Sequence, residues 1–347
     1  MNGKKREETT PEPVAALRRI AFLLERTRAE TYRVKAFRSA AATLLTLGRD
    51  ELRRRGEQRT LRELPGIGSV TEGVIAESLA GHVPRYLREL EEAVEPLAEG
   101  GERLRAALKG DLHSHSDWSD GGSPIEEMAF TATEVGHDYL VLTDHSPRLK
   151  VANGLSVERL ARQLGVVDAI NNHLAGDFRL LKGIEADILD DGRLDQSAEM
   201  LDRLDLVVAS VHSKLRMDRT AMTRRMVTAV GNPRTNVLGH CTGRLVTGGR
   251  GTRAQSEFDA SAVFEACAEH EVAVEINSRP ERCDPPDELI GLAMDKGCLF
   301  SIDSDAHAPG QLDFLDYGCV RARSLGIAHE RVVNTWSIDR LLTWSNR

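Results

Sequence analysis

Histidines and acids gather at the ends of short apolar runs in this sequence. Residues 111–115 read Asp-Leu-His-Ser-His, which places two imidazoles on one side of an extended strand, because side chains alternate with period two. Asp305 and His307 repeat this spacing with a carboxylate first. Imidazole and carboxylate together suit Zn, Mn or Fe, so the pattern predicts a transition-metal cluster. The residues at these run ends are His113, His115, Asp120, Asp144, His145, Glu185, His212, His240, Asp305 and His307.

The number and pairing of these histidines carry the prediction, because a single histidine at a strand end is usually an ordinary hydrogen-bonded residue. The remaining five of the eleven histidines fall on helical or loop segments and are interpreted as ordinary: His82, His137, His173, His270 and His329. Five cysteines without a C-x-x-C pair argue against a disulfide framework or a zinc ribbon and suit a reducing cytoplasm. They are Cys241, Cys267, Cys283, Cys298 and Cys319.

The apolar runs that carry the histidines alternate with helical patterns from Gly110 onward. Strands that alternate with helices predict parallel β/α units. We predict an α/β fold with seven strands closed into a distorted (β/α)7 barrel, because the strand ends of such a barrel meet at one mouth, where sites are built. The predicted strands are 110–115, 139–145, 179–188, 206–212, 236–240, 273–277 and 299–307.

Length and composition exclude several classes of protein. The 347 residues suit two domains, and 41% hydrophobic with 29% charged residues is typical of a soluble globular chain. No stretch of 18 apolar residues exists, and the polar first 13 residues lack a secretory signal, so we expect a cytoplasmic protein without a membrane partner. Aromatic residues make up only 4%, which disfavours stacking platforms for single strands.

A mildly basic head precedes an acidic body. Residues 1–108 carry a formal charge of +3 and residues 109–347 carry −11, and residues 33–62 hold nine basic and three acidic side chains. Such a segment is either a phosphate-binding surface or a solvated helix face, and we favour the solvated face for the arginine run 53–55. We expect a helical DNA-binding domain over 1–95, with two helices between residues 11 and 55. A linker follows over 96–109, and the barrel domain covers 110–347.

The ordered motifs of the body resemble the PHP (polymerase and histidinol phosphatase) domain over nearly all of residues 110–347. The likeness is greatest to the PHP domain of bacterial family X DNA polymerases, through a Leu-Lys-Val-Ala-Asn-Gly stretch at 149–154 and a His-x-Thr-Gly-Arg element at 240–244. The motifs are Asp111-Leu-His113-Ser-His115, Ser119-Asp120-Gly121, Thr143-Asp144-His145-Ser146, Gly183-Ile-Glu185-Ala-Asp187, Ser210-Val-His212, Gly239-His240 and Asp303-Ser-Asp305-Ala-His307.

This resemblance implies three divalent metal ions, of Zn, Mn or Fe, and nine ligands. It places His113, His115 and Asp305 on one ion. Glu185 bridges to a second ion with His212 and His240, and Asp120, His145 and His307 hold the third. Glu185 is thus predicted to be catalytic, and a water activated between two cations attacks a phosphate ester. Cationic groups for the phosphoryl oxygens would be Arg244, Arg282 and Lys150, although a surface salt bridge is an equal alternative for each.

The head contains the string Leu64-Pro-Gly66-Ile-Gly68, which resembles a helix-hairpin-helix. Gly66, Gly68 and Ser69 would present backbone N–H groups to a DNA phosphate, which gives binding without sequence preference. The alternative is a plain helical turn with a glycine cap. The head also resembles the lyase domain of family X polymerases, so its helix containing Arg33, Lys35 and Arg38 is expected to contact DNA.

One departure from the lyase-domain pattern limits the chemistry of the head. Val74 occupies the position of the Schiff-base lysine, and valine forms no imine, so we expect no lyase activity from this position. Only a short linker separates head from body, which leaves no room for a polymerase palm. The sequence therefore predicts a metal-dependent phosphoesterase and not a polymerase.

Three functions remain open at this stage. The first is a nuclease in DNA repair, a 3′-5′ exonuclease or an abasic-site endonuclease. The second is a small-molecule phosphatase of the histidinol-phosphatase type, whose partner is a phosphorylated metabolite. The third is a DNA-binding scaffold with an inactive PHP core, against which the complete ligand set argues. Metal identity and oligomeric state are left open.

Overall fold

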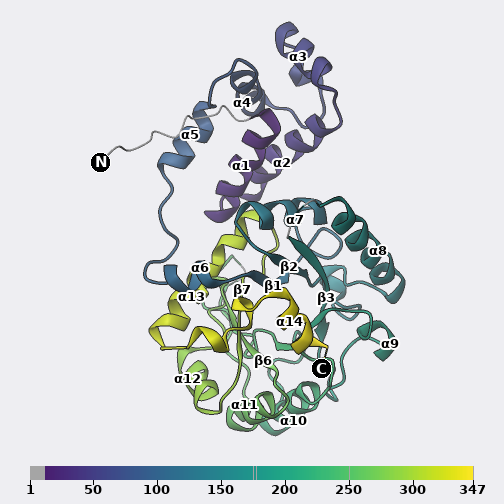
Figure 1. The fold of residues 1–347 in the computed structure, drawn as a ribbon, viewed down its shortest axis with the longest axis vertical. Helices are drawn as coiled ribbons and strands as arrows, with labels where there is room; N and C mark the ends of the chain where they lie inside the picture. The colour runs from purple at the N-terminus through teal and green to yellow at the C-terminus, as the bar shows by residue number, and fades with distance from the viewer. Residues whose placement is uncertain (1–11, 175, 177, 250, 347) are drawn as a thin grey trace. The chain divides into compact units, whose positions relative to one another are not determined.

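The structure is a computed structural model that describes residues 12–174, 176, 178–249 and 251–346 (Figure 1). Two compact units divide the chain, Met1–Pro96 and Leu97–Arg347. Within the segment predicted as a linker, residues 102–107 form a helix that belongs to the second unit. Arg105 of this helix pairs with Asp316 at 3.4 Å, and Gly101 packs so closely on Cys319 and Val320 that a side chain there would collide with them.

The first unit is all helical. Its elements are α1 (Pro13–Arg26), α2 (Thr31–Leu45), α3 (Arg49–Gln58), η1 (Leu61–Glu63), α4 (Ser69–Leu79) and α5 (Arg85–Glu92). Helix α1 starts at Pro13, where the missing N–H costs nothing, and buries Leu17, Ile20 and Leu24. The prediction of two helices between residues 11 and 55 was wrong, because α3 is a third helix. None of the residues of α3 is buried, so apolar periodicity gave no signal for it.

The second unit confirms the predicted barrel architecture. Across the described residues, seven parallel strands form one sheet in the order of the chain. They are β1 (Gly110–Ser114), β2 (Tyr139–Leu142), β3 (Arg179–Asp187), β4 (Leu206–Ser210), β5 (Val237–Leu238), β6 (Ala273–Asn277) and β7 (Phe300–Asp303). Most strands end before the histidine or acid that the sequence placed at the end of its run. Most of the candidate site residues therefore lie on the loops that leave the strands.

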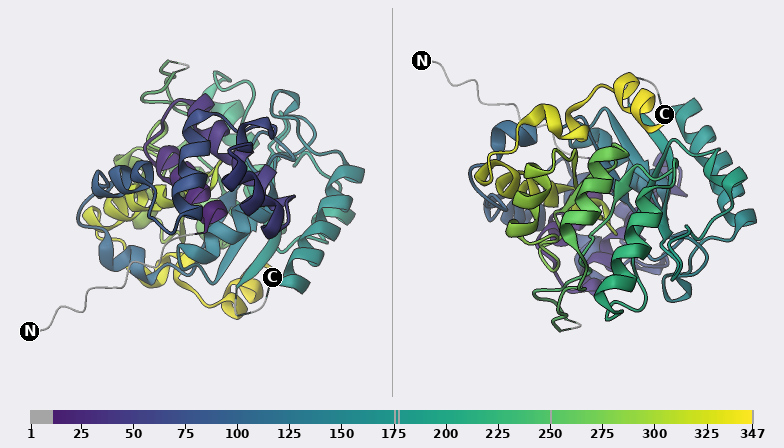
Figure 2. Two further views of the ribbon diagram at one scale, coloured as in Figure 1. Left: turned by 90° about the horizontal axis from the view of Figure 1, so that it is seen from above. Right: turned by 90° about the horizontal axis from the view of Figure 1, so that it is seen from below.

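Helices surround the strands, and short 3-10 helices occupy some of the loops (Figure 1). The helices are α6 (Glu102–Ala107), α7 (Ile125–Glu134), α8 (Val157–His173), α9 (Ala198–Leu201), α10 (Arg219–Val230), α11 (Ala260–Glu269), α12 (Asp287–Asp295), α13 (Leu315–Ser324) and α14 (Ile338–Ser345). The 3-10 helices are η2 (Lys150–Ala152), η3 (Pro309–Phe314), η4 (His329–Arg331) and η5 (Val333–Thr335). The right view of Figure 2 shows α10 and α11, in green, side by side outside the strands.

Strand alternation separates the interior of the barrel from the face that the helices cover. Leu140 and Leu142 of β2 pack with side chains of α7, whereas Tyr139 and Val141 belong to a cluster with Trp336 near the C-terminus. The side chains of the neighbouring strands are divided between the interior and the helix-covered face in the same way, because successive side chains along a strand point to opposite faces. The interior is therefore apolar at the end of the barrel that the C-terminal segment covers.

The barrel is nearly closed between β1 and β7. A single parallel bridge joins Ser114 to Ala306, beyond the end of β7, with a hydrogen bond of 2.8 Å from the His115 N–H to the Ala306 carbonyl. The side chain of Asn334 spans the gap below this bridge, since it donates to the Gly110 carbonyl and accepts from the Ile302 N–H. Side-chain hydrogen bonds of Asn334 thus connect β1 and β7 where backbone hydrogen bonds do not.

Among the described residues, no helix is long and apolar enough to cross a membrane.

Candidate metal centre

The structure brings all nine predicted ligands together at the mouth of the barrel, around the carboxylate of Glu185. This side chain stands on β3, is 1% exposed, and points into the barrel like Leu181 four residues earlier. One oxygen of Glu185 faces His212 and His240, at 3.1 and 2.8 Å from their Nε2 atoms. The other oxygen faces three histidines, one in β1, one directly after β1 and one in the loop after β2: His113, His115 and His145, at 3.3, 3.6 and 2.8 Å.

Two further groups of ligand atoms adjoin this carboxylate. Asp305 lies 3.4 Å from Nε2 of His115 and 4.0 Å from Nε2 of His113. On the outer side, Asp120 lies 3.4 Å from both His145 and His307. Ligand atoms of three sets lie within 4.8 Å of one another: His115, Asp120, His145 and His307; His113, His115 and Glu185; His145, Glu185 and His212. These sets overlap the partition implied by the resemblance without reproducing it. His115 joins the set of Asp120, and His145 stands in the third set where the partition has His240. The partition stays a prediction.

An irregularity in β1 turns His113 toward the centre. Leu112 belongs to the interior apolar cluster, and the adjacent His113 also reaches inward to Glu185. Two neighbours on one face contradict regular strand alternation. The register of β1 against β2 shifts between Asp111 and Ser114, and such a bulge re-aims a side chain.

Glu275 is a buried carboxylate that the sequence reasoning missed. It stands inside β6, is fully buried, and its Oε1 atom lies 2.6 Å from Nδ1 of His113. Its Oε2 atom accepts from the His240 N–H at 2.5 Å and from Asn277 at 3.1 Å. The signal was an acid in the middle of the apolar run Ala-Val-Glu-Ile-Asn, at an inward position of the alternation.

Two other acids from the motifs serve as partners of the ligand loops. Asp144 stands beside His145, yet its carboxylate accepts from the hydroxyls of Ser116 and Ser119 and from Gln163. It therefore holds the loop after β1. Asp187 accepts from the His212 N–H at 3.2 Å and lies 3.4 Å from Nδ1 of the same histidine. It thereby holds the backbone of His212 beside Glu185.

The predicted cationic residues have different positions. Arg282 approaches the centre, since its Nε donates to Asp305 at 3.1 Å. Arg244 donates to the carbonyls of Arg282 and Cys283 and so braces the loop that carries Arg282. Lys150 is exposed in η2, and the structure does not bring it to the ligands.

Arg279 is a second residue that the sequence reasoning missed. Its Nη1 lies 2.8 Å from Nδ1 of His307 and 3.2 Å from the Asp305 carbonyl, and about a fifth of the side chain is exposed. The signal was its place directly after β6, in the same loop as Arg282. Two guanidinium groups from this loop therefore border the predicted ligands, Arg279 at His307 and Arg282 at Asp305.

Electrostatics favour ionised carboxylates and divide the imidazoles. Although burial opposes it, Glu275 and Glu185 raise the pKa of His113 well above its usual range, and Glu185 and Asp120 raise the pKa of His145 to about 10. Burial alone would raise the pKa of Glu185, but the charges of His212 and His145 outweigh it and hold that pKa well below its usual range. Asp305 is likewise buried, and His113 and its other cationic neighbours hold its pKa well below the ordinary value. Burial lowers the pKa of His115, and neighbouring histidines lower it further. Metals bind these groups in their deprotonated forms.

The residues present fit divalent metal ions. Several buried ligand atoms have no hydrogen-bond partner among the described residues, a state that normally destabilises a protein. They include Nε2 of His113, both ring nitrogens of His115 and His212, and Oε2 of Glu185. Convergent imidazole and carboxylate atoms without protein partners are the donor set that Zn, Mn or Fe requires.

The hairpin of the first unit has the backbone expected of a phosphate-binding turn. Gly66 adopts φ of +76°, which favours glycine, and a β-carbon there would lie 3.2 Å from that of Ser39. Gly68 caps α4, and Gly66, Gly68 and Ser69 are exposed. The Pro65 carbonyl accepts from Thr43 of α2 at 2.8 Å, so the turn is attached to the neighbouring helix.

The basic residues predicted to contact DNA are not equivalent. Lys35 is exposed on α2, and Arg33 is exposed with its Nη2 at 2.6 Å from the Tyr86 hydroxyl. Arg38 instead forms a bidentate ion pair with Glu25, whose side chain is 4% exposed. Arg38 therefore fastens α2 to α1, which its sequence position did not reveal. Val74, at the position of the expected lysine, is buried.

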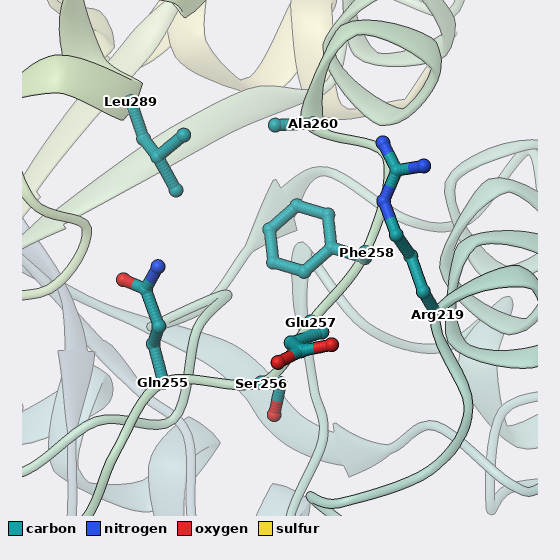
Figure 3. Close-up of a pocket in the computed structure, with 7 residues that line it drawn as sticks. All are labelled: Arg219, Gln255, Ser256, Glu257, Phe258, Ala260 and Leu289. Carbon is teal, nitrogen blue, oxygen red and sulfur yellow. The ribbon is translucent and has the colours of Figure 1, made fainter.

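A pocket of about 270 Å³ in the second unit is lined by none of the predicted site residues (Figure 3). Phe258 and Leu289 face its interior, and Arg219 borders it.

Comparison with known proteins identifies two domain families in the chain. Residues 111–279 match the PHP domain family, and residues 8–84 match the helix-hairpin-helix domain family. The chain is 38% identical over 257 residues to the DNA polymerase/3′-5′ exonuclease PolX of Bacillus subtilis (strain 168), which covers 74% of this chain and 44% of PolX. The chain therefore spans less than half the length of that relative.

Other similar proteins carry phosphatase names. A probable phosphatase of Caldanaerobacter subterraneus subsp. tengcongensis is 27% identical, over 69% of this chain and 91% of that protein. The probable phosphatase YcdX of Escherichia coli (strain K12) is 28% identical, over 67% of this chain and 92% of its own length. The crystal structure of histidinol phosphate phosphatase from Lactococcus lactis subsp. lactis Il1403, with zinc, histidinol and phosphate, aligns at 19% identity and a TM-score of 0.43, over 63% of this chain and 92% of that chain.

Proposed function

We propose that this chain, with its PHP domain and N-terminal helix-hairpin-helix domain, is a metal-dependent phosphodiesterase that cleaves DNA. The observation that carries the proposal is the cluster around Glu185, where imidazoles and carboxylates from several strand ends meet. The similarity to PolX over 74% of the chain supports a hydrolase that works on DNA. We propose the nine residues named above as ligands of three divalent ions.

The bound ions would supply the activation of water and the neutralisation of phosphate charge. The chain's own residues hold the ligands and orient the substrate. Glu185 offers its two oxygens to different sets of histidines, which keeps those sets at a short, fixed separation. Arg279 lies against His307 and Arg282 against Asp305, and about a fifth of each side chain is exposed. We propose that these two guanidinium groups bind the non-bridging phosphate oxygens.

The N-terminal unit supports DNA as the substrate. Gly66, Gly68 and Ser69 form an exposed turn at the start of α4, where backbone N–H groups and the helix dipole favour a phosphate. Lys35 and Arg33 add exposed positive charge on α2. Such contacts read no bases, so we propose binding to DNA ends or abasic sites without sequence preference, in DNA repair.

A second candidate is hydrolysis of a small phosphomonoester. It is favoured by the relatives with phosphatase names, of which this chain covers about nine-tenths. The same metal centre serves either reaction, because fold and ligands do not select the leaving group. This candidate gives the N-terminal unit no part in catalysis.

One experiment separates the two candidates. The purified chain, loaded with Mn²⁺ or Zn²⁺, is assayed on a 3′-recessed DNA duplex and on histidinol phosphate. We expect a higher kcat/KM on the duplex, with loss of activity in Asp305→Asn and upon chelation. A higher kcat/KM on histidinol phosphate would support the phosphatase. Metal analysis of the same preparation, with clearly more than one ion per chain expected, tests the centre itself.

A further inference from the structure

Glu275 connects two ligands that belong to different groups of the centre. Its Oε1 atom lies 2.6 Å from Nδ1 of His113, and its Oε2 atom accepts from the backbone N–H of His240 at 2.5 Å. Glu275, His113 and His240 are all at most 2% exposed. Water therefore does not compete for these hydrogen bonds, and they act at full strength.

The contact with His113 decides which ring nitrogen is free. A neutral imidazole carries one proton, and a carboxylate accepts that proton's hydrogen bond. In this neutral form, with Nδ1–H directed at Glu275, the Nε2 atom of His113 keeps its lone pair. That Nε2 atom lies 3.3 Å from Glu185, and it has no hydrogen-bond partner among the described residues. The free nitrogen thus points at the ligand cluster.

The contact with His240 holds a strained backbone. His240 has φ of +21°, a conformation that residues with a β-carbon rarely adopt. Its N–H is fixed by Glu275, and its Nε2 then lies 2.8 Å from Oε1 of Glu185. Asn277 donates to the same Oε2 atom of Glu275 at 3.1 Å and to Asp305 at 3.1 Å. One carboxylate is therefore linked to ligands on both sides of Glu185.

We propose that Glu275 is a positioning residue of the metal centre: it sets the tautomer of His113 for one ion and the backbone of His240 for a second. This inference rests on the proposed metal centre, and it adds a residue that touches neither ion nor substrate. Outer carboxylates that orient histidine ligands raise metal affinity by about 10–100-fold, which is the effect expected of Glu275.

Glu275→Gln tests this role with almost no change in shape. A glutamine has one acceptor and one donor, whereas His240 and Asn277 both present donors to the same oxygen. If its oxygen serves those donors, its amide nitrogen donates to Nδ1 of His113, which moves the ring proton to Nε2 and blocks the ligand atom. If the amide is reversed, its NH₂ group faces the His240 N–H and the Asn277 amide, which are also donors. The hydrogen bond that holds the His240 backbone is then lost.

The experiment measures Zn²⁺ binding by chelator competition and the ring protons of ¹⁵N-labelled histidine in the Zn²⁺-loaded protein. In the wild type we expect the His113 signal, assigned by its loss in His113→Asn, to show a proton on Nδ1. Glu275→Gln should bind Zn²⁺ about 10–100-fold more weakly. Glu265→Gln is the matched control, because Glu265 is exposed on α11 and pairs with Lys296; its affinity should equal that of the wild type.

The outcomes distinguish this inference from the proposed centre. Unchanged Zn²⁺ affinity in Glu275→Gln would overturn the role of Glu275 while leaving the centre intact. A wild type that takes up no Zn²⁺ would overturn both. If circular dichroism shows that Glu275→Gln does not fold, the ¹⁵N-histidine spectrum of the Zn²⁺-loaded wild type tests the proposal. A proton on Nε2 of His113, or metal on its Nδ1, would refute it.

Discussion

The Nε2 atom of His240 lies 2.8 Å from Oε1 of Glu185, and neither side chain is more than 2% exposed. The opposite oxygen of Glu185 lies 2.8 Å from Nδ1 of His145. The two oxygens of one carboxylate thus serve different groups of ligands. His240 contacts only one of these oxygens, so the two residues are not equivalent in the proposed centre.

Glu185→Gln should therefore remove more metal than His240→Gln. We expect loss of more than one ion per chain for Glu185→Gln and at most one for His240→Gln, measured by elemental analysis after loading. Hydrolysis should fall by ~100-fold or more in Glu185→Gln, or about 3 kcal/mol of barrier, with a smaller loss in His240→Gln. Equal losses of metal in the two variants would contradict a bridging role.

The second prediction concerns the N-terminal unit. A chain of residues 97–347 keeps α6 with the barrel and should hydrolyse bis(p-nitrophenyl) phosphate at nearly the wild-type rate, because all nine proposed ligands remain. Its affinity for duplex DNA should fall by about 10-fold or more, since the phosphate contacts of the hairpin are gone. Fluorescence anisotropy at several salt concentrations measures both the affinity and its salt dependence. Equal DNA binding by the two chains would contradict the helix-hairpin-helix assignment.

The third prediction is that the N-terminal unit lacks lyase chemistry. An amine must attack the opened sugar of an abasic site, and the expected position holds Val74, which is buried. Borohydride trapping on abasic DNA in the presence of EDTA should therefore give no covalent adduct, and incision should require metal. A strong adduct that disappears in Lys35→Ala would show that the exposed Lys35 performs this chemistry instead.

The fourth prediction is a dependence of stability on pH that comes from His137. Burial, with a smaller contribution from the charge of Arg105, lowers the pKa of His137 to about 3. The unfolded chain, with a histidine pKa of about 6.5, binds this proton first, so the folded state loses stability as the pH falls below about 6.5 toward 3. Between pH 7.5 and 5.0 the loss from this group should be about 2 kcal/mol.

Urea unfolding in EDTA at the two pH values checks this dependence. His137→Leu should lose about 2 kcal/mol less than the wild type on acidification, because it has no proton to gain. His329→Leu is the control, since His329 is exposed and should leave the pH dependence unchanged. Identical pH dependence in the wild type and His137→Leu would contradict the burial of a neutral imidazole at this position.

Several features of the site could be predicted because they depend on local periodicity. The position of Glu185 in an apolar run follows from the alternation of side chains along a strand. The inward direction of His113 does not, because the register of β1 shifts there. The order of the strands and their common mouth follow from parallel β/α units. Helix α3 could not be predicted from periodicity, because none of its residues is buried and its sequence therefore has no apolar period.

The partners of charged side chains could not be predicted, because they depend on contacts between segments far apart in the sequence. Arg38 pairs with Glu25 on another helix, and Arg279 rather than Lys150 borders the ligands. Nothing in the residues around Lys150 distinguishes an exposed loop from one that turns inward. Only the packing of the loops at the barrel mouth makes that choice.

The sequence by itself determined the types and spacing of the proposed ligands, the β/α units of the parallel barrel and the hairpin of the N-terminal unit. Each depends on residues that are near one another in the chain. The tertiary structure alone decided that β1 shifts register to turn His113 inward, and that Glu275 lies 2.6 Å from that ring. These two residues are 162 positions apart. A hydrogen bond over that separation exists only because the barrel brings β1 and β6 to one buried mouth, where an unpartnered polar group would be costly.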